Sequence, residues 1–240
     1  MPRRRPAGAR RHGFTLIELM IVIGIIVVLM SVLVVAFSGA FSKSEEARAT
    51  ATIKTLQANI ESYKARWGTA PPSNMQDLGN LMAPNQMLMA PNKTNEGIEC
   101  LVLALRSRKE GGPYLDVPLF ADDARRGNLD LDMVMETAMG PTALDVAEGT
   151  SRDLFEILDP WGNPLVYINI VELRQGRVDQ TITLASGQQV RITATEAQEK
   201  LRHPTTGDYP SDYVLWSFGE DGINDWGRGD DVVSWNKYTD

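Results

Sequence analysis

The most apolar part of the chain lies near its beginning. From Leu19 to Phe37, only Gly24 and Ser31 interrupt a run of apolar residues. At about 1.5 Å of rise per residue, a helix of this length crosses a hydrocarbon core of roughly 30 Å. We therefore expect a transmembrane segment at about residues 14–37.

Charged residues surround and enter this apolar segment. Five arginines precede it, at positions 3, 4, 5, 10 and 11. Because basic residues favour the cytoplasmic side of a membrane, we expect a cytoplasmic N-terminus and a single crossing. Glu18 lies inside the segment. A lone carboxylate at bilayer depth costs roughly 2.5–3.5 kcal/mol, so Glu18 is expected to have a partner and a function.

The helix is expected to continue past the membrane segment. Residues 42–66 contain neither Gly nor Pro and are rich in Ala, Glu, Lys and Gln, which favour helix. Gly68 and the prolines at 71 and 72 should end it. The sequence thus predicts one helix over 14–67, roughly 80 Å long, and a head over 68–240. An apolar stripe with spacings of three and four residues would face the head: Ile53, Leu56, Ile60, Tyr63 and Trp67.

Shorter elements are expected in the head. Residues 73–97 read as a loop, and the D-P-W-G-N-P sequence at 159–164 reads as a turn. The sequence predicts helices over 98–110 and 195–203, a β-hairpin from 178–184 and 189–193, and further strands over 165–173, 213–218 and 231–235. The predicted fold class is α+β: a long N-terminal α-helix, half of it transmembrane, packed on a small antiparallel β-sheet head.

Composition excludes several classes of function. The 240 residues contain 24 Lys and Arg against 31 Asp and Glu, and the only basic cluster is at the N-terminus, which argues against nucleic-acid binding. A single cysteine, Cys100, rules out an intrachain disulfide. His12 and His203 are the only histidines, which leaves little material for a zinc site or a Ser-His-Asp triad.

The last part of the chain contains a Gly-rich acidic segment. It reads S-F-G-E-D-G-I-N-D-W-G-R-G-D-D-V-V-S-W over residues 217–235. Crowded carboxylates with flexible glycine spacing suit Ca²⁺ better than Zn²⁺, although the residue order is not that of an EF-hand. On composition alone, a solvated acidic loop is the alternative.

The N-terminal residues resemble the processing site of type IV pilins and of the pseudopilins of type II secretion. The match is G-F-T-L-I-E at 13–18, after a short basic leader. In these families a prepilin peptidase cuts after the glycine and methylates the new N-terminal phenylalanine. The resemblance implies a leader of residues 1–13, cleavage between Gly13 and Phe14, and Glu18 as the fifth residue of the mature chain.

The expected cleavage gives Glu18 a partner. It would create an ammonium group on Phe14, four residues before Glu18 and on the same helix face. Glu18 can pair with this group in its own subunit or in a neighbouring subunit during assembly, where a low dielectric strengthens the attraction. Two other interpretations leave Glu18 unexplained: a secretory signal peptide cut after Ala40, and a plain signal anchor.

The head resembles the major pseudopilin (G-type) at the 159–164 turn, at Tyr167 and in the acidic C-terminal segment. The chain departs from that family at Val35, where many members have proline, and in apparent insertions near 116–153 and 172–208. The resemblance implies Ca²⁺ held by the carboxylates of Asp221, Asp231, Asp230 and Asp225, with backbone carbonyls of Ser217 and Leu215.

The function implied is that of a non-enzymatic structural subunit of the bacterial inner membrane, with a periplasmic head. It would polymerise into a periplasmic pseudopilus that drives type II protein secretion. Its partners would be copies of itself, other pseudopilins, prepilin peptidase and the inner-membrane assembly platform. One alternative is a surface type IV pilus subunit, in adhesion, motility or DNA uptake. Another is a membrane-anchored exported enzyme using aspartates and a divalent ion, for which no nucleophile–base pair is visible.

Overall fold

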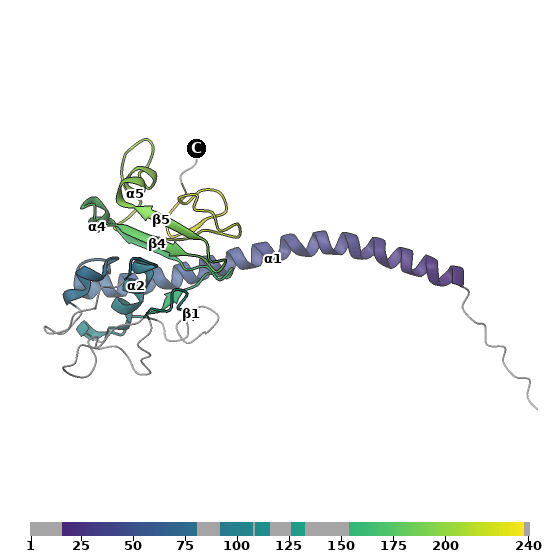
Figure 1. The fold of residues 1–240 in the computed structure, drawn as a ribbon, viewed down its shortest axis with the longest axis horizontal. Coiled ribbons are helices and arrows are strands. Elements are labelled where there is room, and N and C mark those ends of the chain that lie inside the picture. The colour runs from purple at the N-terminus through teal and green to yellow at the C-terminus, as the bar shows by residue number, and fades with distance from the viewer. Residues whose placement is uncertain (1–15, 81–91, 108, 116–125, 133–153, 238–240) are drawn as a thin grey trace, which may run out of the picture. The chain divides into compact units, whose positions relative to one another are not determined.

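The computed structural model describes residues 16–80, 92–107, 109–115, 126–132 and 154–237, with the backbone alone for 32–40 (Figure 1). The chain divides into two compact units, Met1–Lys43 and Ser44–Asp240. The α-helices are α1 (Leu16–Trp67), α2 (Glu96–Arg106), α4 (Ile170–Arg174) and α5 (Ala194–Lys200), with short 3₁₀ turns η1 (Met75–Asn80) and η2 (Lys109–Gly111). The strands are β1 (Arg126–Gly127), β2 (Glu156–Ile157), β3 (Val166–Asn169), β4 (Asp179–Thr183), β5 (Gln189–Thr193), β6 (Tyr213–Ser217) and β7 (Val232–Val233).

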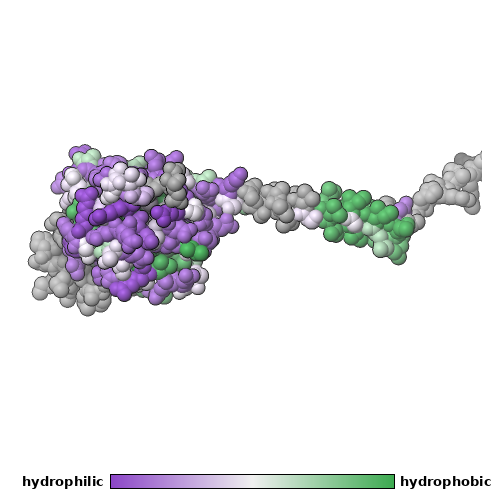
Figure 2. Space-filling model, turned by 90° about the horizontal axis from the view of Figure 1, so that it is seen from above, coloured by the Kyte–Doolittle hydropathy of each residue, from purple (hydrophilic) through white to green (hydrophobic). Residues whose placement is uncertain are grey.

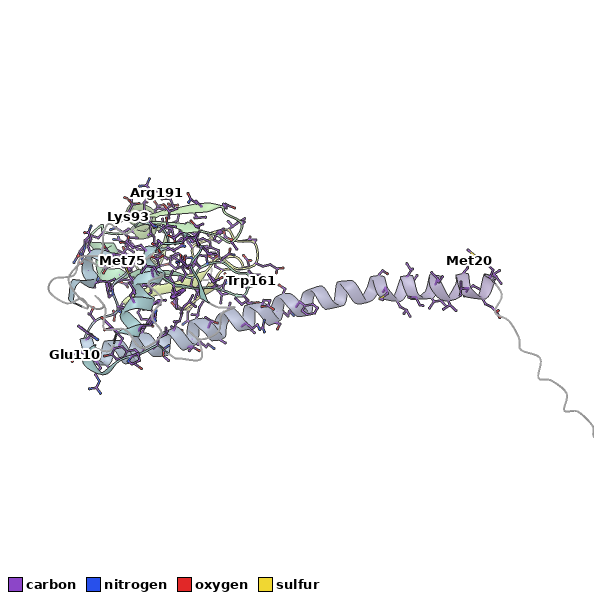
Figure 3. The ribbon with its side chains drawn as sticks, turned by 60° about the horizontal axis from the view of Figure 1, so that its bottom comes forward. Met20, Met75, Lys93, Glu110, Trp161 and Arg191 are labelled. Atoms are coloured by element: carbon purple, nitrogen blue, oxygen red, sulfur yellow. The ribbon has the colours of Figure 1, made fainter. Side chains whose placement is uncertain are left out.

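The first unit contains the beginning of α1. The side chains of residues 16–31 are all exposed and almost all apolar, and Figure 2 shows them as a hydrophobic surface. Met20, labelled in Figure 3, is 64% exposed. An apolar surface on all sides of a helical segment is typical of a segment covered by lipid or by other helices. Among the described residues, none of the helices has a stretch long and apolar enough to cross a membrane.

The second unit is built on the three-stranded antiparallel sheet β3-β6-β7. All residues of β3 and β6 are buried, so both faces of the sheet are covered. Because side chains alternate along a strand, Tyr167 and Leu215 point into one core, and Val166 and Trp216 point into another. The register pairs Tyr167 with Leu215.

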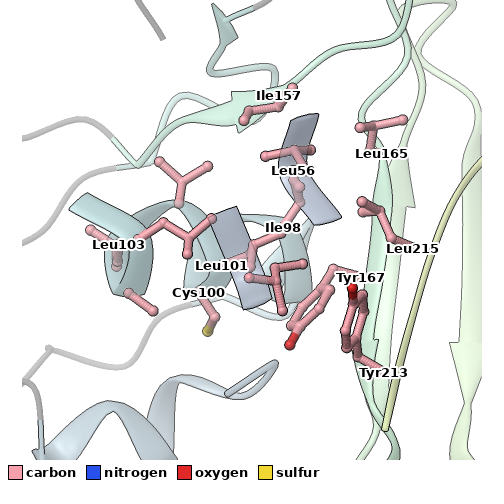
Figure 4. Packing of buried hydrophobic residues seen from close by; sticks show 14 of the residues in the cluster. Leu56, Ile98, Cys100, Leu101, Leu103, Ile157, Leu165, Tyr167, Tyr213 and Leu215 are labelled. Carbon is pink, nitrogen blue, oxygen red and sulfur yellow. The ribbon is translucent and has the colours of Figure 1, made fainter. Parts of the chain in front are cut away.

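The first core lies between the sheet and the two longer helices. The predicted stripe of α1 is buried here, with Leu56 and Ile60 fully inaccessible to solvent. Figure 4 shows Leu56 together with Ile98 and Leu101 of α2, next to Tyr167 and Leu215 of the sheet. The periodicity of α1 thus places its apolar residues against a surface that the strands make apolar at alternate positions.

The second core lies on the other face of the sheet, under the β4–β5 hairpin and the short helices α4 and α5. Ile182 and Ile192, one from each hairpin strand, are fully buried. Leu173 of α4, Ala197 of α5 and Trp216 of the sheet complete it. The segment near 172–208 therefore supplies the layer that covers this face.

Polar side chains connect the end of α1 to the sheet. After Gly68, the chain turns through two prolines, and the carbonyl of Pro71 accepts hydrogen bonds from Tyr167 Oη (2.6 Å) and Asn169 Nδ2 (3.0 Å). Ser73 Oγ accepts from the Asn169 N–H (3.0 Å) and donates to Glu172 (2.7 Å). These bonds fix where the chain leaves α1 relative to β3.

A glycine sets the distance between α2 and the sheet. A β-carbon at Gly97 would collide with the carbonyl oxygen of Tyr167. The Gly97 N–H also donates to Gln180 of β4 (2.9 Å). The first turn of α2 therefore touches backbone that a larger residue would push away.

The observed elements confirm the predicted long helix, the hairpin and the order of the strands, and correct several bounds. β3 ends at Asn169 rather than at 173, because Asn169 Oδ1 accepts from the Val171 N–H (2.9 Å) and begins helix α4. The predicted loop over 73–97 contains η1 and the first turn of α2. The predicted helix over 98–110 begins at Glu96 and ends at Arg106. Residues 14–15, part of the predicted helix, lie outside the described residues.

Truncating the α1 stripe tests the first core. Ile60 is fully buried, so we expect Ile60→Ala to lower the free energy of unfolding by about 2–5 kcal/mol. Ile223→Ala is the matched control, because Ile223 is 56% exposed, and should change it by less than about 0.5 kcal/mol. Denaturant unfolding of the full chain in detergent measures both. Equal losses would contradict this account of the core.

Candidate functional site

The acidic C-terminal segment forms a loop closed by neighbouring strands. β6 and β7 pair antiparallel, with Ser217 opposite Val232. The two ends of the loop between these strands therefore lie next to each other. Aromatic rings hold its interior: Trp216 lies 6.2 Å from Trp226 and 6.1 Å from Trp235, centroid to centroid. The loop is therefore anchored to the second core and its shape is set by packing.

Three of the predicted metal ligands meet in this loop. The carboxylates of Asp221, Asp225 and Asp230 each offer an oxygen within 4.8 Å of the other two. Asp230 Oδ2 accepts from the N–H groups of Glu220 (2.7 Å) and Asp221 (3.1 Å), which fixes its orientation. Gly219 has φ +68°, and a β-carbon there would lie 2.5 Å from Asp230 Oδ2. The glycine spacing thus lets the backbone fold closely around the carboxylates.

The other predicted ligands lie differently. Asp231 is buried, and its Oδ2 accepts from the Gly227 N–H (2.7 Å). Burial, with the charges of Asp225 and Asp230 adding to it, raises the pKa of Asp231 to about 7. Asp231 is not in the group of three carboxylates. The carbonyl of Leu215 accepts from the Ser234 N–H (2.9 Å), so part of its acceptor capacity is used within the sheet.

Ser217 connects the loop to the distant 159–164 turn. Its hydroxyl donates to Asp159 Oδ2 at 2.5 Å. The other oxygen of Asp159 accepts from the N–H groups of Trp161 (3.0 Å) and Asn163 (2.9 Å). Asp159 therefore has a structural role, and it connects two segments whose link the sequence alone did not indicate.

A second group of acidic side chains was missed by the sequence analysis. Glu99, Asp130 and Asp132 also offer carboxylate oxygens within 4.8 Å of one another. Glu99 is fully buried on α2, and burial, followed by the charges of Asp132 and Asp130, raises its pKa to about 11. The amino-acid pattern did not indicate this group, because Glu99 reads as a polar position of an amphipathic helix. Asp130 and Asp132 lie within an insertion to which no chemistry was assigned. The described residues thus contain a second candidate acidic metal-binding cluster.

The predicted processing and assembly residues lie at the start of the chain. Gly13 and Phe14 are outside the described residues. Glu18 lies in the first turn of α1, where a carboxylate interacts favourably with the helix dipole.

Comparison with known families identifies the N-terminal segment. Residues 8–34 match the model of the prokaryotic N-terminal methylation motif. This N-terminal segment is type IV pilin-like. The match contains the G-F-T-L-I-E site and most of the apolar segment, which the sequence analysis singled out. Neither the curated proteins nor the solved structures gave a match.

The architecture of the chain is of the kind that the N-terminal motif suggests. A long N-terminal helix packed on small antiparallel sheets is consistent with the pilin fold. Pilin-like proteins are structural subunits of fibres that are processed by prepilin peptidase, and they are not enzymes. The motif implies a membrane-anchored precursor.

Removing the link from Ser217 tests its structural role. We expect Ser217→Ala to lower the free energy of unfolding by about 1–3 kcal/mol, because buried Asp159 loses a hydrogen-bond donor. Ser62→Ala is the control: its exposed hydroxyl bonds only within α1, and its loss should cost less than about 0.5 kcal/mol. Denaturant unfolding gives both values. A neutral Ser217→Ala would show that the two segments are held by other contacts.

Proposed function

We propose that this chain is a subunit of a periplasmic pseudopilus that drives type II protein secretion. Prepilin peptidase would cut between Gly13 and Phe14 and methylate Phe14. Residues of about 14–37 would hold the subunit in the inner membrane, with the N-terminus in the cytoplasm and the head in the periplasm. The methylation-motif match over residues 8–34 and the exposed apolar surface of the first unit support this topology.

The observation that carries the choice of a pseudopilus is the group of carboxylates in the C-terminal loop. Ca²⁺ binds oxygen ligands at about 2.3–2.6 Å, so two ligands of one ion lie less than about 5 Å apart. The oxygens of Asp221, Asp225 and Asp230 fulfil this condition. The donor set contains oxygen only, which suits Ca²⁺ and not Zn²⁺. We propose that these three residues are the core ligands of a Ca²⁺ ion.

The remaining ligands would come from the base of the loop. Asp231 is a candidate because its Oδ1 is buried and accepts no hydrogen bond from a described residue. The backbone carbonyls of Ser217 and Leu215 are proposed as further donors. Ca²⁺ would remove the mutual repulsion of the carboxylates and hold the loop in one shape for neighbouring subunits.

Assembly would rest on the N-terminal segment. The Phe14 ammonium and the Glu18 carboxylate attract each other most strongly where the dielectric is low, as in a bundle of apolar helices. A neighbour's ammonium would therefore favour entry of a new subunit with Glu18 in place. The partners would be copies of this chain, other pseudopilins and the inner-membrane assembly platform.

Loss of assembly should stop export. We expect deletion of the gene in the source bacterium to leave exported proteins in the periplasm and to lower their amount in the medium. Glu18→Ala should fail to restore export, because assembly would lose its charge pair. Glu46→Ala, which removes an exposed carboxylate from the same helix, should restore it. Protein assays of the medium and periplasm measure this. Intact export with loss of surface fibres would instead identify a surface type IV pilus subunit.

Calcium should stabilise the loop. Binding at a hundredfold excess over the dissociation constant contributes about 2.7 kcal/mol, which raises the melting temperature of the full chain by about 5–10 °C. Asp221→Ala combined with Asp225→Ala should reduce the rise, because two ligands are lost. Asp208→Ala, an exposed aspartate outside the loop, should leave it unchanged. Thermal melting with Ca²⁺ and with EDTA tests this. An undiminished rise in the double variant would exclude the loop as the Ca²⁺ site.

A further inference from the structure

Three acidic side chains from separate parts of the chain meet beside α2. Glu99 lies in the first turn of α2 and is 0% exposed. Asp130 and Asp132 follow strand β1 and are half-buried. One carboxylate oxygen of each residue lies within 4.8 Å of the others. Like charges at this separation repel each other, so the fold brings them together at a cost.

The segment that carries the two aspartates is held by its own hydrogen bonds. Asn128 Oδ1 accepts from the Asp132 N–H (3.1 Å), and Asn128 Nδ2 donates to the Asp132 carbonyl (2.8 Å). Glu156 of β2 accepts from the Leu129 N–H (3.1 Å) and from Asn95 Nδ2 (2.8 Å), next to α2. Backbone and amide groups therefore determine the shape of the segment without using the Oδ1 atom of either aspartate.

The free oxygens of the cluster point to a ligand. Asn92 Nδ2 donates to Asp130 Oδ2 (2.9 Å) and to Asp132 Oδ2 (3.2 Å). The Oδ1 atoms of both aspartates and both oxygens of Glu99 are buried and accept no hydrogen bond from any described residue. No ion pair within the described part of the chain involves these three residues. Buried acceptors without donors are rare in folded proteins and are costly.

Protonation alone does not satisfy this arrangement. Burial strongly favours the neutral form of Glu99, as its raised pKa indicates. Burial also raises the pKa of Asp132 to about 7, so protons on Glu99 and Asp132 would supply two hydrogen-bond donors, whereas four oxygens of the cluster have none. A divalent cation would contact an oxygen of every side chain and would offset most of the negative charge.

We propose that Glu99, Asp130 and Asp132 bind a hard divalent cation, with Ca²⁺ as the preferred ion. The ligands are all oxygen, which excludes the soft and imidazole-preferring metals. Ca²⁺ is preferred over Mg²⁺ because it tolerates irregular geometry and bidentate carboxylates, whereas Mg²⁺ keeps several waters in a strict octahedron. One oxygen of Glu99 lies within 4.8 Å of the aspartate oxygens, and both Glu99 oxygens are buried without a donor among the described residues, so the carboxylate can offer a bidentate pair.

A cation at this site would join α2 to the segment over residues 128–132. Glu99 is fixed on a buried helix of the first core, whereas the two aspartates belong to the apparent insertion near 116–153. The ion would therefore hold the part of this insertion at residues 128–132 against α2. The site is separate from the C-terminal loop and does not rest on the secretion function.

Counting bound ions tests the proposal. The full chain in detergent, freed of metal with EDTA and exchanged into buffer, is titrated with CaCl₂ by calorimetry. We expect two Ca²⁺ per chain: one for the cluster and one for the C-terminal loop. Glu99→Gln should lower the affinity of one site at least about tenfold, because the bidentate carboxylate is lost. Glu96→Gln is the control, since Glu96 is a buried carboxyl of the same helix outside the cluster.

The outcomes separate this proposal from the one on the loop. A single ion that is lost in Glu99→Gln and retained with Asp221→Ala and Asp225→Ala supports the cluster alone. A single ion that is retained in Glu99→Gln and lost with Asp221→Ala and Asp225→Ala would overturn the proposed cation site at the cluster. The absence of any Ca²⁺ binding would overturn it as well. Tighter binding of MgCl₂ than of CaCl₂ at this site would overturn the choice of ion.

Thermal melting distinguishes a ligand from a structural residue. Without metal, Glu99→Gln should melt at or above the temperature of the unaltered chain, because it removes a buried ionisable group. In saturating Ca²⁺ it should melt lower. If Glu99→Gln fails to fold, Asp132→Asn replaces it in both measurements. Parallel melting changes with and without Ca²⁺ would show that the cluster only packs and binds no ion.

Discussion

The burial of one stripe of α1 against the β3-β6-β7 sheet is the interaction on which the rest of the head depends. Leu56 and Ile60 occupy the same core as Tyr167 and Leu215. Each such side chain contributes roughly 1.5–3 kcal/mol when it leaves water. A sheet this small cannot be stable by itself, so the helix on one face and the β4–β5 hairpin on the other are both required.

Burial in this core also makes the hydrogen bonding of the acidic residues a guide to whether they bind a ligand. In water a carboxylate needs no partner, but in a protein interior its charge must be paired, neutralised or bound to a metal. Glu172 illustrates pairing by hydrogen bonds, because it accepts from both the N–H (3.0 Å) and the hydroxyl (2.7 Å) of Ser73. Glu156 is likewise bonded, whereas Glu99 accepts no hydrogen bond from any described residue. The contrast between these buried glutamates, and not their burial alone, is the basis for a cation beside α2.

The sequence was sufficient to predict what depends on periodicity and on local turn chemistry. The stripe of α1, its end at Gly68 and the hairpin turn at Ser186 and Gly187 each require only nearby residues, and the structure confirms them. The conversion of β3 into α4 was not predicted, because the cap at Asn169 competes with strand formation in a way that apolar pattern does not reveal.

The two acidic groups show where sequence reasoning reaches its limit. Asp221, Asp225 and Asp230 are close in sequence, and glycines between them allow a compact loop, so a metal site could be predicted there. Glu99 is separated from Asp130 and Asp132 by about thirty residues, and only the tertiary fold brings them together. Even in the loop, the resemblance favoured Asp231 over Asp230, whereas Asp230 is the residue that lies with Asp221 and Asp225. Which of two neighbouring side chains faces the other carboxylates depends on the fold of the loop.

If both sites bind calcium, the head would reach its final structure only in a compartment with enough Ca²⁺. Extracellular Ca²⁺ modules typically bind with dissociation constants of about 10⁻⁴–10⁻³ M, well above the range of cytosolic sensors. Sites of that affinity would fill only outside the cytoplasm, and so only after the head had crossed the membrane as proposed above. The C-terminal loop would then take its final shape on the side where neighbouring heads meet. A subunit whose loop carries uncompensated carboxylates would repel its neighbours, which are equally acidic, so the ion would favour assembly of completed heads over incomplete ones.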